Sequence, residues 1–182
     1  MSSLLSRYFA LTDRLGRADW LLSTLARFLF AAVLLVYFLN SGLTKLGEGL
    51  AGLFVPSAGA YAQIFPKAFE AAGYDTDALS VFHQIVVVAG TWAEFILPAA
   101  IVLGLFTRLA ALGMIGFVVL QSLTDIYGHG QTDALGAWFD RFPDALVLDQ
   151  RGLWVLLLLV LVVKGAGPLS FDRALRGGTG RV

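Results

Sequence analysis

The sequence contains no cysteine and little charge. Asp, Glu, Lys and Arg make up 14% of its 182 residues, and the formal net charge is zero. Without cysteine the chain carries no disulfide, no cysteine-ligated iron–sulfur cluster and no dithiol relay. Without an excess of positive charge it offers no basic surface for nucleic acid. The sequence also lacks a phosphate loop, a nucleotide fingerprint, a haem motif and a Ser/His/Asp set, so its motifs assign it to no enzyme class.

Apolar residues dominate instead. They make up 58% of the chain, and the mean hydropathy is +0.77. Apolar runs predict four membrane spans, at about residues 21–43, 81–106, 109–125 and 152–166. The fourth is the shortest, because its unbroken apolar run covers only residues 153–163. Four such spans favour an antiparallel four-helix transmembrane bundle, so we expect residues 1–182 to form one all-α membrane domain.

The segments between and beyond the spans show helical patterns of their own. Residues 1–19 predict an interfacial helix on the membrane surface, from apolar side chains at helical spacing: Leu4, Leu5, Tyr8, Leu11 and Leu15. The loop after the first span has an apolar face, which predicts a lid helix: Ile64, Phe65, Ala68, Phe69 and Ala72. Thr107 is placed to cap the third span. Residues 167–182 form a tail with a short helix, and the N-terminus shows no signal-peptide pattern, so we expect no removal there.

Basic residues are distributed unevenly between the two sides of the predicted bundle, and the richer side normally faces the cytoplasm. We therefore expect both termini and the turn at Arg108 to be cytoplasmic, with loops 47–80 and 124–151 facing outward. The richer side holds Arg7, Arg14, Arg17, Arg27, Arg108, Lys164, Arg173, Arg176 and Arg181; the other holds Lys45, Lys67, Arg141 and Arg151.

Glu94 lies near the middle of the second span, where a carboxylate is costly unless it meets a cation or a polar cavity. Arg27, inside the first span, is the expected partner. The sequence therefore predicts a buried charge pair between Arg27 and Glu94. Such a pair is compatible with a purely structural role and with a proton site.

Polar residues gather near the outward ends of three spans: Asn40, Thr44 and Lys45 on the first, His83 on the second, Gln121 and Asp125 on the third. His83 and Glu94 share one helical face. If these groups face inward together, they line an outward-opening pocket with Glu94 at its floor, suited to a small ring-shaped ligand. The alternative for His83 and for His129 is a hydrogen bond at a helix end, and we expect no metal site.

Several phrases resemble the DoxX family of small bacterial membrane proteins. They are Glu94-Phe-Ile-Leu-Pro-Ala-Ala, the Gly-Leu-Phe-Thr-Arg-Leu-Ala-Ala turn at 104–111, Gly42-Leu-Thr-Lys45-Leu, and the ending Gly-Ala-Gly-Pro-Leu-Ser-Phe-Asp-Arg at 165–173. The resemblance covers about Leu25 to Leu175. It implies a four-helix, multi-pass protein of the bacterial cytoplasmic (inner) membrane. Some relatives are linked to thiosulfate:quinone oxidoreductase or to a quinol oxidase, others to thiol or oxidative-stress systems, and the family has no single reaction.

Three functions remain open at this point. The leading hypothesis is a membrane subunit or accessory of a quinone-linked redox complex that binds a quinone or small reductant in the outward pocket. Under this hypothesis the chain binds a protein partner and carries no covalently bound cofactor. The second is a non-catalytic scaffold or assembly factor, and the third is a small-solute transporter. Membership of a family supports an inference about fold more strongly than one about reaction. The three hypotheses therefore share one architecture and differ only in function.

Overall fold

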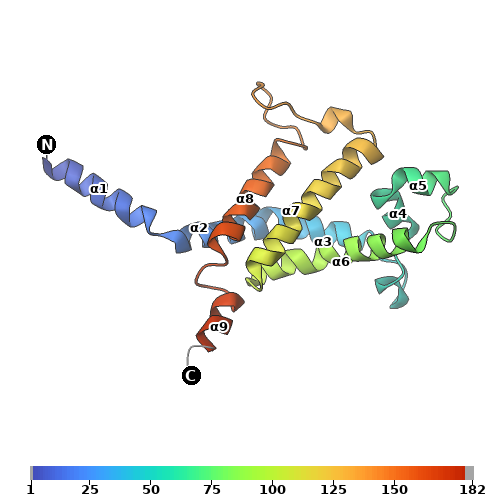
Figure 1. The fold of residues 1–182 in the computed structure, drawn as a ribbon, viewed down its shortest axis with the longest axis horizontal. Coiled ribbons are helices and arrows are strands. Elements are labelled where there is room, and N and C mark those ends of the chain that lie inside the picture. Colours follow the sequence, from blue (N-terminus) through green and yellow to red (C-terminus); the bar gives the residue numbers. More distant parts are fainter. Residues whose placement is uncertain (1, 179–182) are drawn as a thin grey trace.

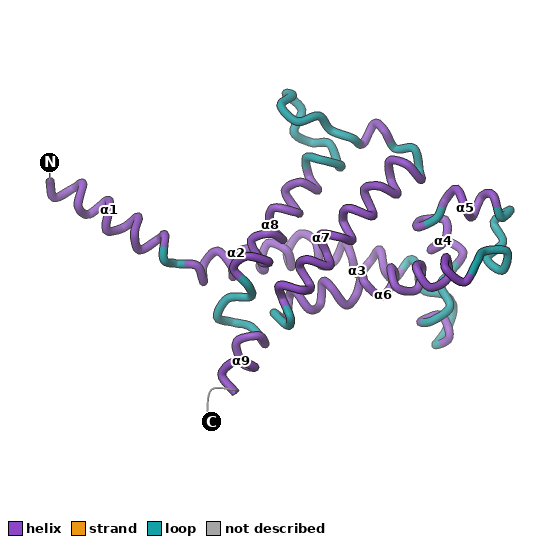
Figure 2. Tube along the Cα trace, viewed as in Figure 1, coloured by secondary structure: helices purple, strands orange, loops and turns teal. Residues whose placement is uncertain are grey.

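A computed structural model describes residues 2–178, and within them all regular structure is helical (Figures 1 and 2). The α-helices are α1 (Ser2–Gly16), α2 (Asp19–Phe30), α3 (Val36–Leu43), α4 (Ala58–Ile64), α5 (Pro66–Ala71), α6 (Val81–Leu103), α7 (Thr107–Leu123), α8 (Gln150–Lys164) and α9 (Phe171–Gly178). Two π-helical segments, η1 (Ala31–Leu35) and η3 (Thr124–Gly128), and two 3₁₀ turns, η2 (Ala51–Leu53) and η4 (Thr132–Ala134), complete the described elements.

Three of these helices are long and apolar enough to cross a membrane. They are Asp19–Leu43, which joins α2, η1 and α3, then Val81–Leu103 and Thr107–Gly128. These limits agree within a few residues with the first three predicted spans. The predicted fourth span coincides with α8, which packs against α2 and α7. Its 15 residues reach about 22 Å, short of a hydrocarbon core of about 30 Å. The crossing by α8, and with it the four-span bundle, remains a prediction.

Helices α2, α3, α6, α7 and α8 pack together, and this packed set (the bundle) has two ends. The loop end carries residues 44–80 and 129–149, and the tail end carries residues 104–108 and 165–178. Figure 1 shows α7 beside α8 and α3 beside α6, with α4 and α5 at the loop end of α6. Helix α1 extends away from the bundle beyond the tail end and keeps its apolar side chains exposed. A helix therefore forms where the interfacial helix is expected, while its position on a membrane surface remains a prediction.

Aromatic and aliphatic side chains fill the centre of the bundle. Phe30, Phe38, Met114, Leu158 and Leu161 are fully buried in one cluster. A second cluster lies under the first loop, where helices α4 and α5 bury Tyr61 and Phe69 against Val87 of α6. The predicted lid thus forms as two short helices. It covers the first turns of α6, which therefore project beyond α3.

The turn between α6 and α7 is close to the tail in space. Gly104 has φ +69° and ends α6; a Cβ added there would lie 2.5 Å from the Cβ of Ser170 and 3.0 Å from Cζ of Arg27. Only glycine suits both the backbone conformation and this approach. The prediction that Thr107 caps α7 is wrong. The cap comes from Asp172 of α9, whose carboxylate accepts hydrogen bonds from the backbone N–H of Phe106 (2.7 Å) and of Thr107 (2.9 Å).

Candidate functional site

The π-helical segment η1 sets the direction in which the end of the first span faces. Phe30, Leu34 and Phe38 are all buried although they are spaced by four. In a regular α-helix each such step would rotate the side chain by about 40° away from the core. The wider turn at 31–35 absorbs this rotation and keeps the three side chains in line. The residues that follow, Ser41 and Lys45, consequently face α6.

Glycine then permits close contact between α3 and α6. Gly42 lies against the ring of Phe95, and an added Cβ there would be only 2.6 Å from the ring carbon Cζ. Because Glu94 precedes Phe95 in α6, this approach brings its carboxylate to the face that carries Ser41 and Lys45.

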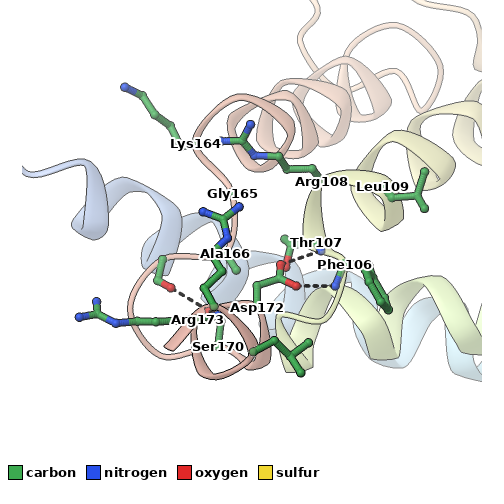
Figure 3. A pocket seen from close by; sticks show the side chains of 13 residues that line it. Phe106, Thr107, Arg108, Leu109, Lys164, Gly165, Ala166, Ser170, Asp172 and Arg173 are labelled. Atoms are coloured by element: carbon green, nitrogen blue, oxygen red, sulfur yellow. Dashed lines mark hydrogen bonds between the residues drawn. The ribbon is translucent and has the colours of Figure 1, made fainter. Parts of the chain in front are cut away.

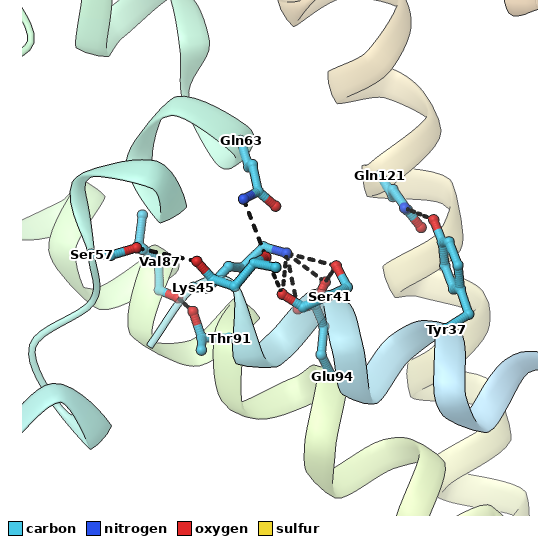
Figure 4. Close-up of polar contacts among 10 residues, drawn as sticks. Tyr37, Ser41, Lys45, Ser57, Gln63, Val87, Thr91, Glu94 and Gln121 are labelled. Carbon is cyan, nitrogen blue, oxygen red and sulfur yellow. Dashed lines mark hydrogen bonds and ion pairs between the residues drawn. The ribbon is translucent and has the colours of Figure 1, made fainter. Parts of the chain in front are cut away.

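Lys45 and Glu94 form a buried ion pair at this contact (Figure 4). Nζ of Lys45 lies 3.0 Å from both carboxylate oxygens. Ser41 joins the two, because its hydroxyl donates to Oε1 of Glu94 at 2.9 Å and accepts from Nζ of Lys45 at 2.8 Å. The Lys45 and Glu94 side chains are 5% and 3% exposed. Each charge is therefore neutralised by the other and saturated with hydrogen bonds, as a charged pair inside apolar surroundings requires.

The predicted pair between Arg27 and Glu94 is wrong. Arg27 instead donates to four backbone carbonyls at the tail end: Ile101, Val102, Ala166 and Leu169. The last carbonyls of a helix lack partners within the helix, and a guanidinium fork can satisfy several of them at once. Arg27 and Glu94 do not meet because α6 begins beyond the end of α3 (Figure 1). Glu94 therefore lies level with Ser41 and Lys45, not with Arg27.

The other polar residues of the predicted pocket lie in separate contacts. Gln121 donates from Nε2 to the Tyr37 hydroxyl at 2.8 Å. The ring nitrogen Nδ1 of His83 lies 2.8 Å from the Ser80 hydroxyl, and its ring packs edge-on to Phe65.

The remaining members of the predicted pocket are also held apart. Thr44 donates to the Ser41 carbonyl at 2.7 Å, and Asn40 is exposed. The described pockets lie elsewhere: one of about 420 Å³ within residues 47–58, and one at the tail end. Neither is lined by His83 or Glu94, so the structure does not gather the predicted set around one cavity with Glu94 at its floor.

Asp125 belongs to a second, part-buried ion pair that sequence reasoning missed. Nη2 of Arg151, the second residue of α8, lies 2.6 Å from its carboxylate, and Nη1 donates to the Ser122 hydroxyl. Arg151 is 3% exposed. The sequence placed Arg151 only among the basic residues of the outward side, and no local pattern paired it with Asp125. Each ion pair joins two helices: Lys45 with Glu94 joins α3 to α6, and Arg151 with Asp125 joins α8 to η3.

The tail-end pocket has a volume of about 660 Å³ and lies between the start of α7, the end of α8 and α9 (Figure 3). Asp172 forms part of its wall. Burial raises the pKa of this carboxyl group, but hydrogen bonds from Thr107 and Phe106 and the charge of Arg176 outweigh that effect. The pKa of Asp172 therefore lies below its usual value. The carboxylate stays ionised and holds α9 against the first turn of α7.

A family model described as DoxX matches residues 23–124, more than half of the chain. No curated protein and no solved structure matches the chain. The matched range contains the Lys45–Glu94 pair and the π-helical segment η1, and it ends before α8 and the tail. Among residues 2–178, no group of three or more His, Asp or Glu side chains is placed to hold a metal ion.

Proposed function

We propose that this chain, which belongs to the DoxX family, is a non-catalytic membrane subunit that serves as a scaffold or assembly factor in a quinone-linked redox complex. Its apolar helices make it a membrane protein in contact with lipid. The observation that carries the proposal is the closed Lys45–Glu94 pair, whose charged atoms bind one another and Ser41.

A closed pair favours a structural role over a ligand site. A substrate or ion at Glu94 would have to displace the ammonium group of Lys45, and stranding one charge of a buried pair typically costs about 3–5 kcal/mol. The Ser41 hydroxyl is occupied in the same contact. The pair is thus suited to locking α3 onto α6, which fixes the loop end where a partner could dock.

The surface that supports docking is the aromatic loop, defined here as residues 135–148. Trp138 and Phe142 are well exposed, and the Phe139 side chain is fully exposed with φ +69°. Arg141 lies over the Phe142 ring at 4.8 Å. Exposed aromatic and arginine side chains are enriched in protein interfaces. We therefore assign the docking of a protein partner to this loop.

Co-purification tests this assignment. The full chain would be isolated from its host membrane after mild crosslinking, and bound proteins and quinone would be measured by mass spectrometry. A Trp138→Ala/Phe139→Ala/Phe142→Ala variant should lose its partner. Phe28→Ala, which removes a similarly exposed ring from α2, should keep it. Retention of the same partner by the triple variant would argue against docking at the aromatic loop.

A second candidate, direct binding of a quinone head group, has one observation in its favour. Oε1 of Gln121 is buried and has no hydrogen-bond partner among the described residues. It sits beside the Tyr37 hydroxyl, and the Tyr37 ring contacts Trp154. A quinol hydroxyl could donate to this oxygen. Quinone that co-purifies with the isolated chain and is lost in Gln121→Leu would favour this candidate over the scaffold.

The proposal includes an orientation, with both termini in the cytoplasm and the protein in the bacterial inner membrane. It rests on the distribution of basic residues. Reporter domains fused after residue 182 and within residues 133–144 should lie on opposite sides of the membrane. Reporters on the same side would exclude the four-span arrangement.

A further inference from the structure

The tail-end pocket concentrates positive charge. Arg108 at the start of α7, Lys164 at the end of α8, and two arginines of α9, Arg173 and Arg176, all line it. Two acidic side chains accompany them: Asp172 in its wall, and Asp19, which pairs with Lys164 at 2.8 Å. Four basic groups against two acidic ones leave the pocket positive, in a chain whose formal net charge is zero.

Two of these basic groups have no partner within the described chain. The guanidinium groups of Arg108 and Arg173 make no hydrogen bond or ion pair with residues 2–178, whereas Asp172 is engaged by the backbone of α7. Figure 3 shows Arg108 extending from α7 towards the end of α8, and a Cβ added at Gly165 would lie 3.4 Å from its Nε. A guanidinium fork binds two oxygens of a phosphate at once, so these groups can hold such an anion.

The carbonyl groups that would repel an anion here are already satisfied. Ala166 and Leu169 present their oxygens to Arg27, which lies inside the bundle and not in the pocket lining. Arg27 thereby offsets the negative partial charge of these carbonyl oxygens, which follow the C-terminal end of α8. The side chains of Arg108 and Arg173 remain available to an external negative charge.

We propose that the tail-end pocket binds the phosphate headgroup of an anionic phospholipid. Phosphate chemistry alone would also suit a free phosphate ion, but the apolar part of the lining favours a lipid. Phe106, Leu109 and Leu175 line the pocket and are all exposed. They offer acyl chains an apolar surface beside the charged groups. The pocket adjoins the start of α7, and α7 begins the helix Thr107–Gly128, which is long enough to cross a membrane. Basic pockets at the ends of such helices are suited to anionic headgroups.

Native mass spectrometry of the full chain in detergent tests the proposal. The probes are phosphatidylglycerol, phosphatidylcholine of the same acyl chains, and inorganic phosphate. We expect phosphatidylglycerol to be retained more strongly than either of the others. Removing one basic group near an anionic headgroup should weaken retention by about five-fold. The Arg108→Gln/Arg173→Gln variant should therefore retain phosphatidylglycerol roughly thirty-fold more weakly, by the same reasoning.

Two controls separate charge from folding. Lys67→Gln removes one positive charge from an exposed position of α5 at the loop end and should leave lipid retention unchanged. Arg108→Lys/Arg173→Lys keeps both charges but loses the two-oxygen contacts, so it should retain phosphatidylglycerol more strongly than the double glutamine variant and less strongly than the unaltered chain. Equal retention of phosphatidylglycerol and phosphatidylcholine, or undiminished retention by the double glutamine variant, would overturn the proposal. Tighter binding of inorganic phosphate than of lipid would overturn the assignment to a lipid.

Discussion

Removing the charges of Lys45 and Glu94 singly and together gives the sharpest test of the buried pair. Glu94→Gln keeps the size of the side chain and an oxygen for the Ser41 hydroxyl, but it strands the ammonium group of Lys45. Lys45→Met keeps the length of the side chain and strands the carboxylate. Because both side chains are almost fully buried, each single variant should lose about 3–5 kcal/mol of unfolding free energy.

The double variant Lys45→Met/Glu94→Gln should lose far less than the sum of the two. It buries no charge, and its remaining amide keeps a hydrogen bond from Ser41. Groups in direct contact typically show coupling energies of about 0.5–3 kcal/mol, and a saturated ion pair belongs at the upper end of that range. Reversible unfolding in mixed detergent micelles, followed by tryptophan fluorescence, measures all four proteins under the same conditions.

Arg27 supplies the matched control for this cycle. Its guanidinium binds carbonyls at the tail end and does not contact Glu94. A cycle of Arg27→Gln with Glu94→Gln should therefore be additive within about 0.5 kcal/mol. Additive losses for Lys45 with Glu94, or strong coupling for Arg27 with Glu94, would refute the arrangement described above.

Three further predictions concern the tail end. Arg27→Lys should loosen residues 165–178, because an ammonium group cannot span the four carbonyls, which are part-buried or exposed; each lost hydrogen bond should cost about 1 kcal/mol, and hydrogen exchange should rise in α9 but not in α4. The pKa of Asp172 is lowered in the folded protein, so its contribution to stability is present above pH 3.8, the usual value, and is lost as the pH falls through the lowered pKa; a fluorescent label on α9 should report release there, and Asp172→Asn should lack that step. Gly104→Ala should cost more than 1 kcal/mol because of φ +69° and the contact with Ser170, whereas Gly116→Ala, inside α7 with no atom within 4 Å, should stabilise the fold by about 0.4–1 kcal/mol.

The spans were predictable because hydropathy is a local property of the chain. Each apolar run must be helical to satisfy its backbone in lipid, and its length alone sets the limits of Asp19–Leu43, Val81–Leu103 and Thr107–Gly128. The lid was predictable for a related reason, since the apolar spacing around Phe69 marks a helical face. Neither inference needs to know how one helix is placed against another.

The partner of Glu94 depends on such placement. The expected pair of Arg27 with Glu94 requires the first two spans to begin and end at the same levels, but α6 extends beyond α3, and its first turns pack against the lid helices. The π-helical segment 31–35 then rotates Ser41 and Lys45 towards α6. The apolar residues of this segment give no sequence signal that predicts a π-helical turn. The i, i+4 spacing of Ser41 and Lys45 was the available signal. Read together with the shallow position of Lys45, it could have suggested a cation reaching back along its own helix.

The Arg27 contacts connect helices at the tail end, and the two ion pairs connect helices at the loop end. Arg27 connects α2 to the end of α6 and to the segment after α8 by hydrogen bonds to backbone carbonyls, which are present whatever the sequence there. The Lys45–Glu94 and Arg151–Asp125 pairs close the loop end through side chains that only these residues supply. Loss of one partner of the Lys45–Glu94 or Arg151–Asp125 pair leaves the other charge without its counter-charge, which destabilises this packing. The Arg151–Asp125 pair joins α8 to η3, the two elements that flank the aromatic loop, and this connection is consistent with the proposed docking of a partner there.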